Sequence, residues 1–141
     1  MIAWHDCIVF ILAKSHQKAQ QEFKKLLAPL GLTSLQFLTL ALLATEADIS
    51  GAEICERLMI DKSTLSGVLE RLVEKGLVIK ETDARDRRAL SIRLTDTASR
   101  MAGKLAHIPE TINATLLESL SLEEQLLLKR MLRDIYSNPK R

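Results

Sequence analysis

Aromatic residues are scarce in this chain, at 4% of 141 residues, and there are only two cysteines. An aliphatic core is therefore expected, which suits packed helices. Two cysteines without a C-x-x-C pair exclude a disulfide scaffold. The apolar runs Cys7–Ala13 and Phe37–Ala44 are too short to span a bilayer. Because the N-terminus also lacks a basic region and a small-residue cleavage site, we expect a cytoplasmic protein of one domain's length, with reduced thiols.

The chain also lacks a large net charge of either sign and the common enzyme motifs. The formal net charge is only +2, so a case for nucleic-acid binding must rest on where the charge lies. No G-x-S-x-G, H-E-x-x-H, P-loop or G-x-G-x-x-G occurs, so we expect no enzyme and no cofactor. His5, Asp6, Cys7 and His16 match no recognised metal-ligand spacing, and we expect no metal site.

The chain does contain strong helix signals. Thr33-x-x-Gln36, Ser50-x-x-Glu53 and Ser121-x-x-Glu124 have the form of capping boxes, while Gly76 provides a helix stop. Apolar spacing and these signals predict helices over Trp4–Leu27, Ser34–Thr45, Ser50–Leu58, Lys62–Lys75, Asp96–Leu120 (bent or split by Pro109) and Ser121–Tyr136. A hairpin is predicted from Leu77–Ile79 and Leu90–Leu94. The fold class is therefore mainly α with a small β-hairpin wing.

Two neighbouring segments are suited to reading DNA. The helix over 62–75 has one apolar stripe, and its opposite face carries Lys62, Ser63, Thr64, Ser66, Gly67 and Arg71. Small hydroxyl side chains on such a face can approach base edges and phosphates. The hairpin tip carries Arg85, Asp86, Arg87 and Arg88. Arginines at a hairpin tip suit a narrow minor groove.

Blander interpretations of each segment remain open. The helix is also compatible with an ordinary amphipathic helix whose polar face is wet, and the tip with a solvated charged turn. Between residues 33 and 95 the chain has nine basic and ten acidic residues, so this segment is not uniformly basic. DNA binding would then depend on a few well-placed arginines and a dimer's doubled footprint, with steep salt sensitivity. The same charge balance leaves a winged helix used for protein docking as an alternative.

From residue 32 to residue 95 the sequence resembles the MarR family of bacterial winged-helix regulators. The residues that carry this resemblance are Leu32-Thr33-x-x-Gln36, Ile60-Asp61-Lys62-Ser63-Thr64-Leu65-Ser66, Leu72-Val73-Glu74-Lys75-Gly76-Leu77-Val78, and Asp86-Arg87-Arg88 leading to Ile92-Arg93-Leu94-Thr95. Ala98 departs from the glycine common after this motif. The flanking helices match only in pattern and length.

The resemblance implies an architecture and a function. It implies an N-terminal dimerisation helix in residues 1–32, a winged helix-turn-helix DNA-binding domain in 33–95, and C-terminal dimerisation helices in 96–141. The expected protein is a homodimeric transcriptional regulator, by the family's habit a repressor, on a pseudo-palindromic operator in double-stranded DNA. Carried over by position, Ser63, Thr64 and Ser66 would face the major groove, and Arg88 the minor groove with Asp86 as its brace.

The resemblance also suggests how DNA binding is controlled. Family members commonly respond to small aromatic or anionic effectors between the dimer helices and the winged domain, or to cysteine oxidation. Cys7 lies on the first helix about two residues earlier than in oxidant-sensing relatives, so a redox sensor is the alternative and a structural or incidental cysteine is favoured. Cys55 is expected in the core.

Overall fold

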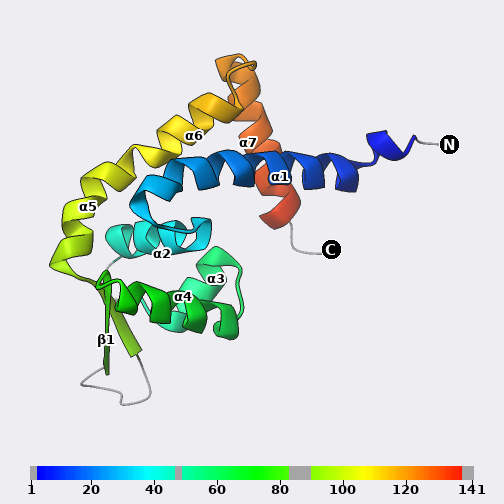
Figure 1. Cartoon of the computed structure of the whole chain (residues 1–141). Helices are drawn as coiled ribbons and strands as arrows, with labels where there is room; N and C mark the ends of the chain where they lie inside the picture. The colour runs from blue at the N-terminus through cyan, green and yellow to red at the C-terminus, as the bar shows by residue number, and fades with distance from the viewer. Residues whose placement is uncertain (1–2, 47–48, 83–89, 138–141) are drawn as a thin grey trace.

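Seven α-helices and one hairpin make up the computed structural model, which describes residues 3–46, 49–82 and 90–137 (Figure 1). In chain order the elements are the 3₁₀ turn η1 (Trp4–Asp6), α1 (Ile8–Leu27), the 3₁₀ turn η2 (Ala28–Leu30), α2 (Ser34–Thr45), α3 (Gly51–Leu58), α4 (Lys62–Glu74), β1 (Val78–Thr82), β2 (Leu90–Leu94), α5 (Asp96–Ala106), α6 (Ile108–Leu116) and α7 (Leu122–Ser137). Helices α2, α3 and α4 lie beside the hairpin, α1 crosses above α2, and α5 and α6 lead away toward α7 (Figure 1). The predicted fold class is confirmed.

All three predicted capping boxes are present. At α2 the Gln36 amide N–H donates to Thr33 Oγ1 at 3.2 Å, and the Thr33 amide donates back to Gln36 Oε1 at 3.1 Å. The same reciprocal pair joins Ser50 with Glu53 at α3. It also joins Ser121 with Glu124 at α7. Each box satisfies amides that the first helical turn leaves unpaired, so short sequence motifs determine where these helices begin.

One aliphatic core joins the winged part of the chain to the end of α1. Its fully buried side chains are Leu27, Leu40, Ile54, Leu72 and Ile92. Phe37 adds the single buried aromatic ring among the described residues and contacts the half-buried ring of Phe23 edge-to-face, with centroids 5.3 Å apart. The scarcity of aromatics predicted such a core. Cys55 is half-buried and packs against this core, close to expectation.

The hairpin has a regular antiparallel register, from Val78 opposite Leu94 to Thr82 opposite Leu90. Its first strand covers Val78–Thr82, whereas the sequence predicts Leu77–Ile79, so the strand begins one residue later and ends three residues later than predicted. Gly76 has φ 66°, and the Leu77 amide donates to the Leu72 carbonyl at 2.9 Å. Because the Leu77 amide takes part in the C-terminal cap of α4, the strand begins only after Leu77. A single bridge between Ser50 and Ser91 attaches the hairpin to the start of α3.

The predicted first helix is interrupted at Cys7. Cys7 has an extended backbone (φ −66°, ψ 124°) and separates η1 from α1. The Trp4 ring packs edge-on against Phe10, with centroids 5.0 Å apart, so η1 stays in contact with α1 although the helix is broken between them. The prediction of one helix from Trp4 is wrong by this short segment.

The predicted long helix after the hairpin is split, the second of the two outcomes that Pro109 allowed. Helix α5 ends at Ala106 and α6 begins at Ile108, with Pro109 in its first turn, and α6 ends at Leu116, short of the predicted Leu120. Proline has no amide hydrogen to continue the upstream helix, and it fits best in the first turn of a new one.

Apolar side chains are left uncovered on α1 and α7. In α7, every residue is exposed or half-buried. The exposed large apolar side chains on these two helices are Ile8, Val9, Ile11, Leu122, Leu126, Leu127, Met131, Leu132, Ile135 and Tyr136. Among the described residues, no single helix has the length and apolar character to cross a bilayer. Taken together, Ile8–Leu30 and Ser34–Thr45 would be long and apolar enough, but they are bent by 71° relative to each other.

Met59 ends α3 in a conformation that favours glycine. It has φ 52°, and the Ile60 amide donates to the Cys55 carbonyl at 3.0 Å, the pattern that Gly76 forms after α4. We expect Met59→Gly to raise the free energy of unfolding by about 1 kcal/mol, because the left-handed penalty disappears. Urea denaturation checks this, with Met59→Ala as the control, since alanine removes the 65% exposed side chain but keeps the penalty. A glycine variant no more stable than the alanine variant would contradict it.

Candidate nucleic-acid interface

Helix α4 presents a polar face to solvent because its apolar face is held by the core. Leu65, Leu69 and Leu72 are buried, and they recur at helical spacing. Val73, predicted to share this stripe, is 41% exposed and lies at its edge. The residues of the opposite face, Lys62, Ser63, Thr64, Ser66 and Arg71, are all exposed, as the amphipathic pattern requires. This face is therefore accessible to a macromolecule.

Two hydroxyls of this face are already engaged with carboxylates. Thr64 Oγ1 donates to Asp61 Oδ2 at 3.0 Å, and Ser66 Oγ donates to Glu70 Oε1 at 3.2 Å. Each hydroxyl oxygen still has lone pairs to accept from a base amino group. The carboxylates also place negative charge beside the polar face, which disfavours contact with phosphate at these points. Glu70 was not among the predicted site residues, and only its i+4 spacing from Ser66 could have indicated it.

Lys62 and Arg71 lie far apart on α4. They are nine residues apart, which is about 14 Å along a helix axis. Lys62, Ser63 and Thr64 are in the first turn and Ser66 begins the second, whereas Arg71 is in the last turn and lines a polar groove with Thr33 and Gln36. The structure thus brings Lys62, Ser63, Thr64 and Ser66 together and leaves Arg71 separate.

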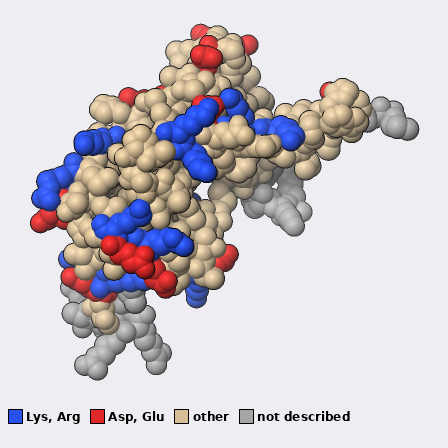
Figure 2. Space-filling view, in the orientation of Figure 1, with Lys and Arg blue, Asp and Glu red and all other residues tan. Residues whose placement is uncertain are grey.

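The predicted arginine tip lies outside the described residues. Arg85, Asp86, Arg87 and Arg88 all belong to 83–89. The two strands that carry this segment are described, and they extend from the end of α4 (Figure 1). In Figure 2, Lys and Arg side chains alternate with Asp and Glu side chains over the helices next to the hairpin, as the charge count predicts.

Thr95 and Lys75 hold the winged part together; the sequence predicts Thr95 or Asp96 as the cap of the helix after the hairpin, and Thr95 is the cap, whereas Lys75 has no predicted role. Thr95 Oγ1 donates to the Gly76 carbonyl at 2.7 Å and accepts from the Ala98 amide at 3.2 Å, so one hydroxyl links the end of α4 to the start of α5. Lys75 Nζ donates to the Gly31 carbonyl at 2.7 Å. Only tertiary structure brings the latter pair together, since 44 residues separate them.

Asp61 fixes the beginning of α4 and gives it a pH dependence. The Thr64 amide donates to Asp61 Oδ1 at 2.7 Å, and this bond, together with that from the Thr64 hydroxyl, lowers the pKa of Asp61 below its ordinary 3.8. A lowered pKa means that the carboxylate stabilises the fold above pH 3.8 and that this contribution is lost as the pH falls below it.

We expect Asp61→Asn to reduce this acid sensitivity. Asparagine still caps a helix but does not titrate. Its midpoint of thermal unfolding should therefore fall less than that of the unmodified protein between about pH 5 and about pH 3. Circular dichroism melts at several pH values check this. Parallel curves for the two proteins would show that Asp61 is not responsible.

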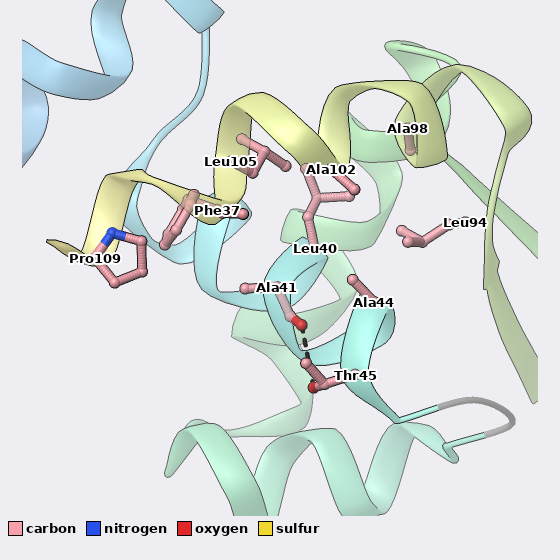
Figure 3. Close-up of a pocket in the computed structure, with 11 residues that line it drawn as sticks. Phe37, Leu40, Ala41, Ala44, Thr45, Leu94, Ala98, Ala102, Leu105 and Pro109 are labelled. Carbon is pink, nitrogen blue, oxygen red and sulfur yellow. Dashed lines mark hydrogen bonds between the residues drawn. The ribbon is translucent and has the colours of Figure 1, made fainter. Parts of the chain in front are cut away.

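A second feature lies on the other side of α2. An apolar cavity of about 320 Å³ lies between parts of α2 and α5, with Phe37 and Leu40 on one side, Ala102 and Leu105 on the other, and Pro109 at one end (Figure 3). Leu94, the last residue of β2, also lines it. The cavity therefore lies where the hairpin and α5 meet.

Comparisons with known proteins bear on this arrangement. A family model described as the MarR family matches residues 30–89. The organic hydroperoxide resistance transcriptional regulator of Bacillus subtilis is 30% identical over 105 residues, which cover 74% of this chain and 71% of that protein.

Solved structures share the fold. BpsR of Bordetella bronchiseptica, described with regulation of its DNA binding by 6-hydroxynicotinic acid, superposes with a TM-score of 0.91 at 23% identity, over 99% of both chains. A mutant MarR of Escherichia coli, complexed with operator DNA, gives a TM-score of 0.85 at 23% identity, over 96% of this chain and 99% of that one. Together with the helix-turn-helix and hairpin described above, these similarities establish that the chain belongs to the MarR family of winged helix-turn-helix transcriptional regulators.

Proposed function

We propose that this chain forms a homodimer that binds a pseudo-palindromic operator in double-stranded DNA, represses transcription there, and is released by a small-molecule effector. The observation that supports this most strongly is helix α4, whose leucine stripe is buried while the face from Lys62 to Ser66 is fully accessible next to the hairpin. A helix of 13 residues is about 20 Å long and fits the major groove.

The residues of the proposed interface divide into those that contact bases and those that contact the DNA backbone. Ser63, Thr64 and Ser66 contact base edges in the major groove, and Lys62 and Arg71 contact phosphates on either side. In the wing, Arg88 enters the minor groove with Asp86 as its brace, and Arg85 and Arg87 contact the backbone. Because the winged segment has no net positive charge, these few cations supply most of the electrostatic attraction.

Dimerisation is supported by the apolar surface of α1 and α7. An exposed apolar surface of this extent on a folded chain marks a site of interaction with another protein. In the proposed domain organisation, residues 1–32 and 96–141 form the dimer and residues 33–95 bind DNA. Two-fold symmetry would then place the two α4 helices about one turn of DNA apart, about 34 Å.

Genomic footprinting of the purified protein tests this function, and Arg88→Ala tests the wing. We expect Arg88→Ala to weaken operator binding about tenfold or more at fixed salt, because one minor-groove contact is lost, without changing the circular dichroism spectrum. Arg100→Ala is the matched control, since it removes an equal charge from α5. An unchanged operator affinity for Arg88→Ala would remove the wing from the proposal. A protein-docking module would show neither a footprint nor salt-dependent retention on duplex DNA.

The cavity between α2 and α5 supports control by an effector. It is within the size range of small-molecule sites, and it touches both the hairpin and α5. BpsR, which shares the fold, is described as regulated by 6-hydroxynicotinic acid. An effector of this chain would bind in the cavity and weaken operator binding by favouring a different arrangement of α5 and the hairpin.

Oxidation of Cys7 is a second way to control binding, and one relative favours it. The Bacillus subtilis relative is named for organic hydroperoxide resistance. Cys7 is an exposed free thiol at the start of α1, on the surface proposed to form the dimer. If it senses oxidants, organic hydroperoxide will release the operator from the unmodified protein and not from Cys7→Ser. Equal release from both proteins would exclude Cys7.

A further inference from the structure

The cavity between α2 and α5 has an unusual lining for a site that would bind organic acids. None of the described residues that line it carries a charge. Five of the lining residues are alanines, which leave the space open, and the other walls are mainly aliphatic (Figure 3). Its one side-chain hydroxyl belongs to Thr45.

Thr45 offers little to a ligand. Its hydroxyl donates to the carbonyl of Ala41 at 3.2 Å (Figure 3) and to that of Leu42 at 3.0 Å, so its proton is already used within α2. Pro109, at one end of the cavity, has no amide hydrogen. A carboxylate placed inside the cavity, below its exposed rim, would therefore lose its hydration without gaining a donor, and an unpaired buried charge is strongly disfavoured.

We infer that the effector site of this chain selects uncharged, apolar molecules and discriminates against carboxylates of the same shape. This inference rests on the proposed control by an effector and specifies the chemistry of that site. The volume of about 320 Å³ is enough for a fused two-ring hydrocarbon skeleton or a medium alkyl chain, because a cavity of about 150 Å³ already holds benzene.

A ligand in this position contacts both the hairpin and α5, whose arrangement the proposed effector would change. Leu94 is the last residue of β2, and Ala98 lies in the first turn of α5. Thr95, between them, is bonded to the Gly76 carbonyl at the end of α4. Apolar contacts in the cavity therefore act directly on the junction that joins the hairpin, α4 and α5.

Paired probes test the selectivity. Isothermal titration of the full chain would compare indole with indole-3-carboxylate and octan-1-ol with octanoate at neutral pH. We expect each neutral member to bind at least ten times more tightly than its anion. Equal or tighter binding of the carboxylates would overturn the inference, and so would failure of both neutral probes to bind.

Substitutions locate the binding. Ala102→Leu fills the cavity and should abolish binding of the neutral probes. Gly103→Leu is the matched control, because it adds the same side chain one position along α5, where an added Cβ meets no atom within 4 Å. Ala102→Val serves the same purpose if the larger side chain prevents folding, with circular dichroism to check the fold. Binding that persists in folded Ala102 variants would place the ligand elsewhere and overturn the inference.

A third variant tests the reason for the selectivity. Ala44 lies on the exposed rim of the cavity, and Ala44→Lys supplies the missing cation. We expect its preference to shift at least tenfold toward octanoate, and an unchanged preference would contradict the electrostatic argument. Binding is measured here without DNA, so failure of the selectivity is distinguishable from failure of operator recognition, which footprinting tests separately.

Discussion

Leu126→Glu combined with Ile135→Glu should convert the protein to monomers and weaken operator binding roughly 100-fold or more. The two side chains are 62% and 57% exposed on α7, although leucine and isoleucine are usually buried in folded proteins. In the proposed dimer they are covered by the second copy. A glutamate there would lose its hydration without a partner, and the interface cannot compensate for two such charges.

The expected loss of operator affinity has a separate cause. A monomer contacts one half-site and therefore forms half the phosphate and base contacts of a dimer. It also has no attached second subunit, which in a dimer binds the second half-site at a high effective concentration. Sedimentation measures the oligomeric state, and a gel-shift assay at fixed salt measures affinity. Leu126→Met with Ile135→Met is the control, since it keeps both positions apolar. A double glutamate variant that still sediments as a dimer would place the interface elsewhere.

The second large effect is expected from the buried face of α4. Leu72 is 0% exposed and fixes this helix against the core, together with Leu65 and Leu69. Leu72→Ala should lower the free energy of unfolding by about 2–5 kcal/mol, through lost burial and the cavity that it leaves. This is a large part of the stability of a small domain, so specific DNA binding should weaken as well, because α4 loses its fixed orientation.

The neighbouring residue provides the control for this change. Val73 is 41% exposed on the same turn, and Val73→Ala should cost far less. Urea denaturation of the two variants under identical conditions measures the difference. Similar losses for both would mean that Leu72 does not hold α4 to the core as described.

The sequence predicted best what depends on nearby residues. The three capping boxes, the stop at Gly76 and the break before Pro109 each involve groups within a few positions of one another. The apolar stripe on α4 could also be predicted, because helical spacing alone decides which side chains share a face. The exposed polar residues from Lys62 to Ser66 could be proposed as DNA contacts for the same reason.

Features that depend on how side chains pack, or on which rotamers they adopt, could not be predicted. The interruption at Cys7 is accompanied by the edge-on packing of the Trp4 and Phe10 rings, which no sequence motif encodes. Lys75 bonds to Gly31, and Thr95 to Gly76, only after the helices have packed. The bonds that engage Thr64 and Ser66 with carboxylates depend on rotamers, and spacing merely permits them.

The sequence by itself thus determined the order of the helices and hairpin, the helix ends that carry a cap or a stop, and the polar face of α4, because caps, stops and periodicity act over a few residues. Tertiary packing alone decided that small residues of α2 and α5 enclose an uncharged cavity, and that α7 stays uncovered in a single chain. The physical reason is that a cavity and an uncovered surface depend on how well distant side chains fill the space between helices, which no single segment specifies.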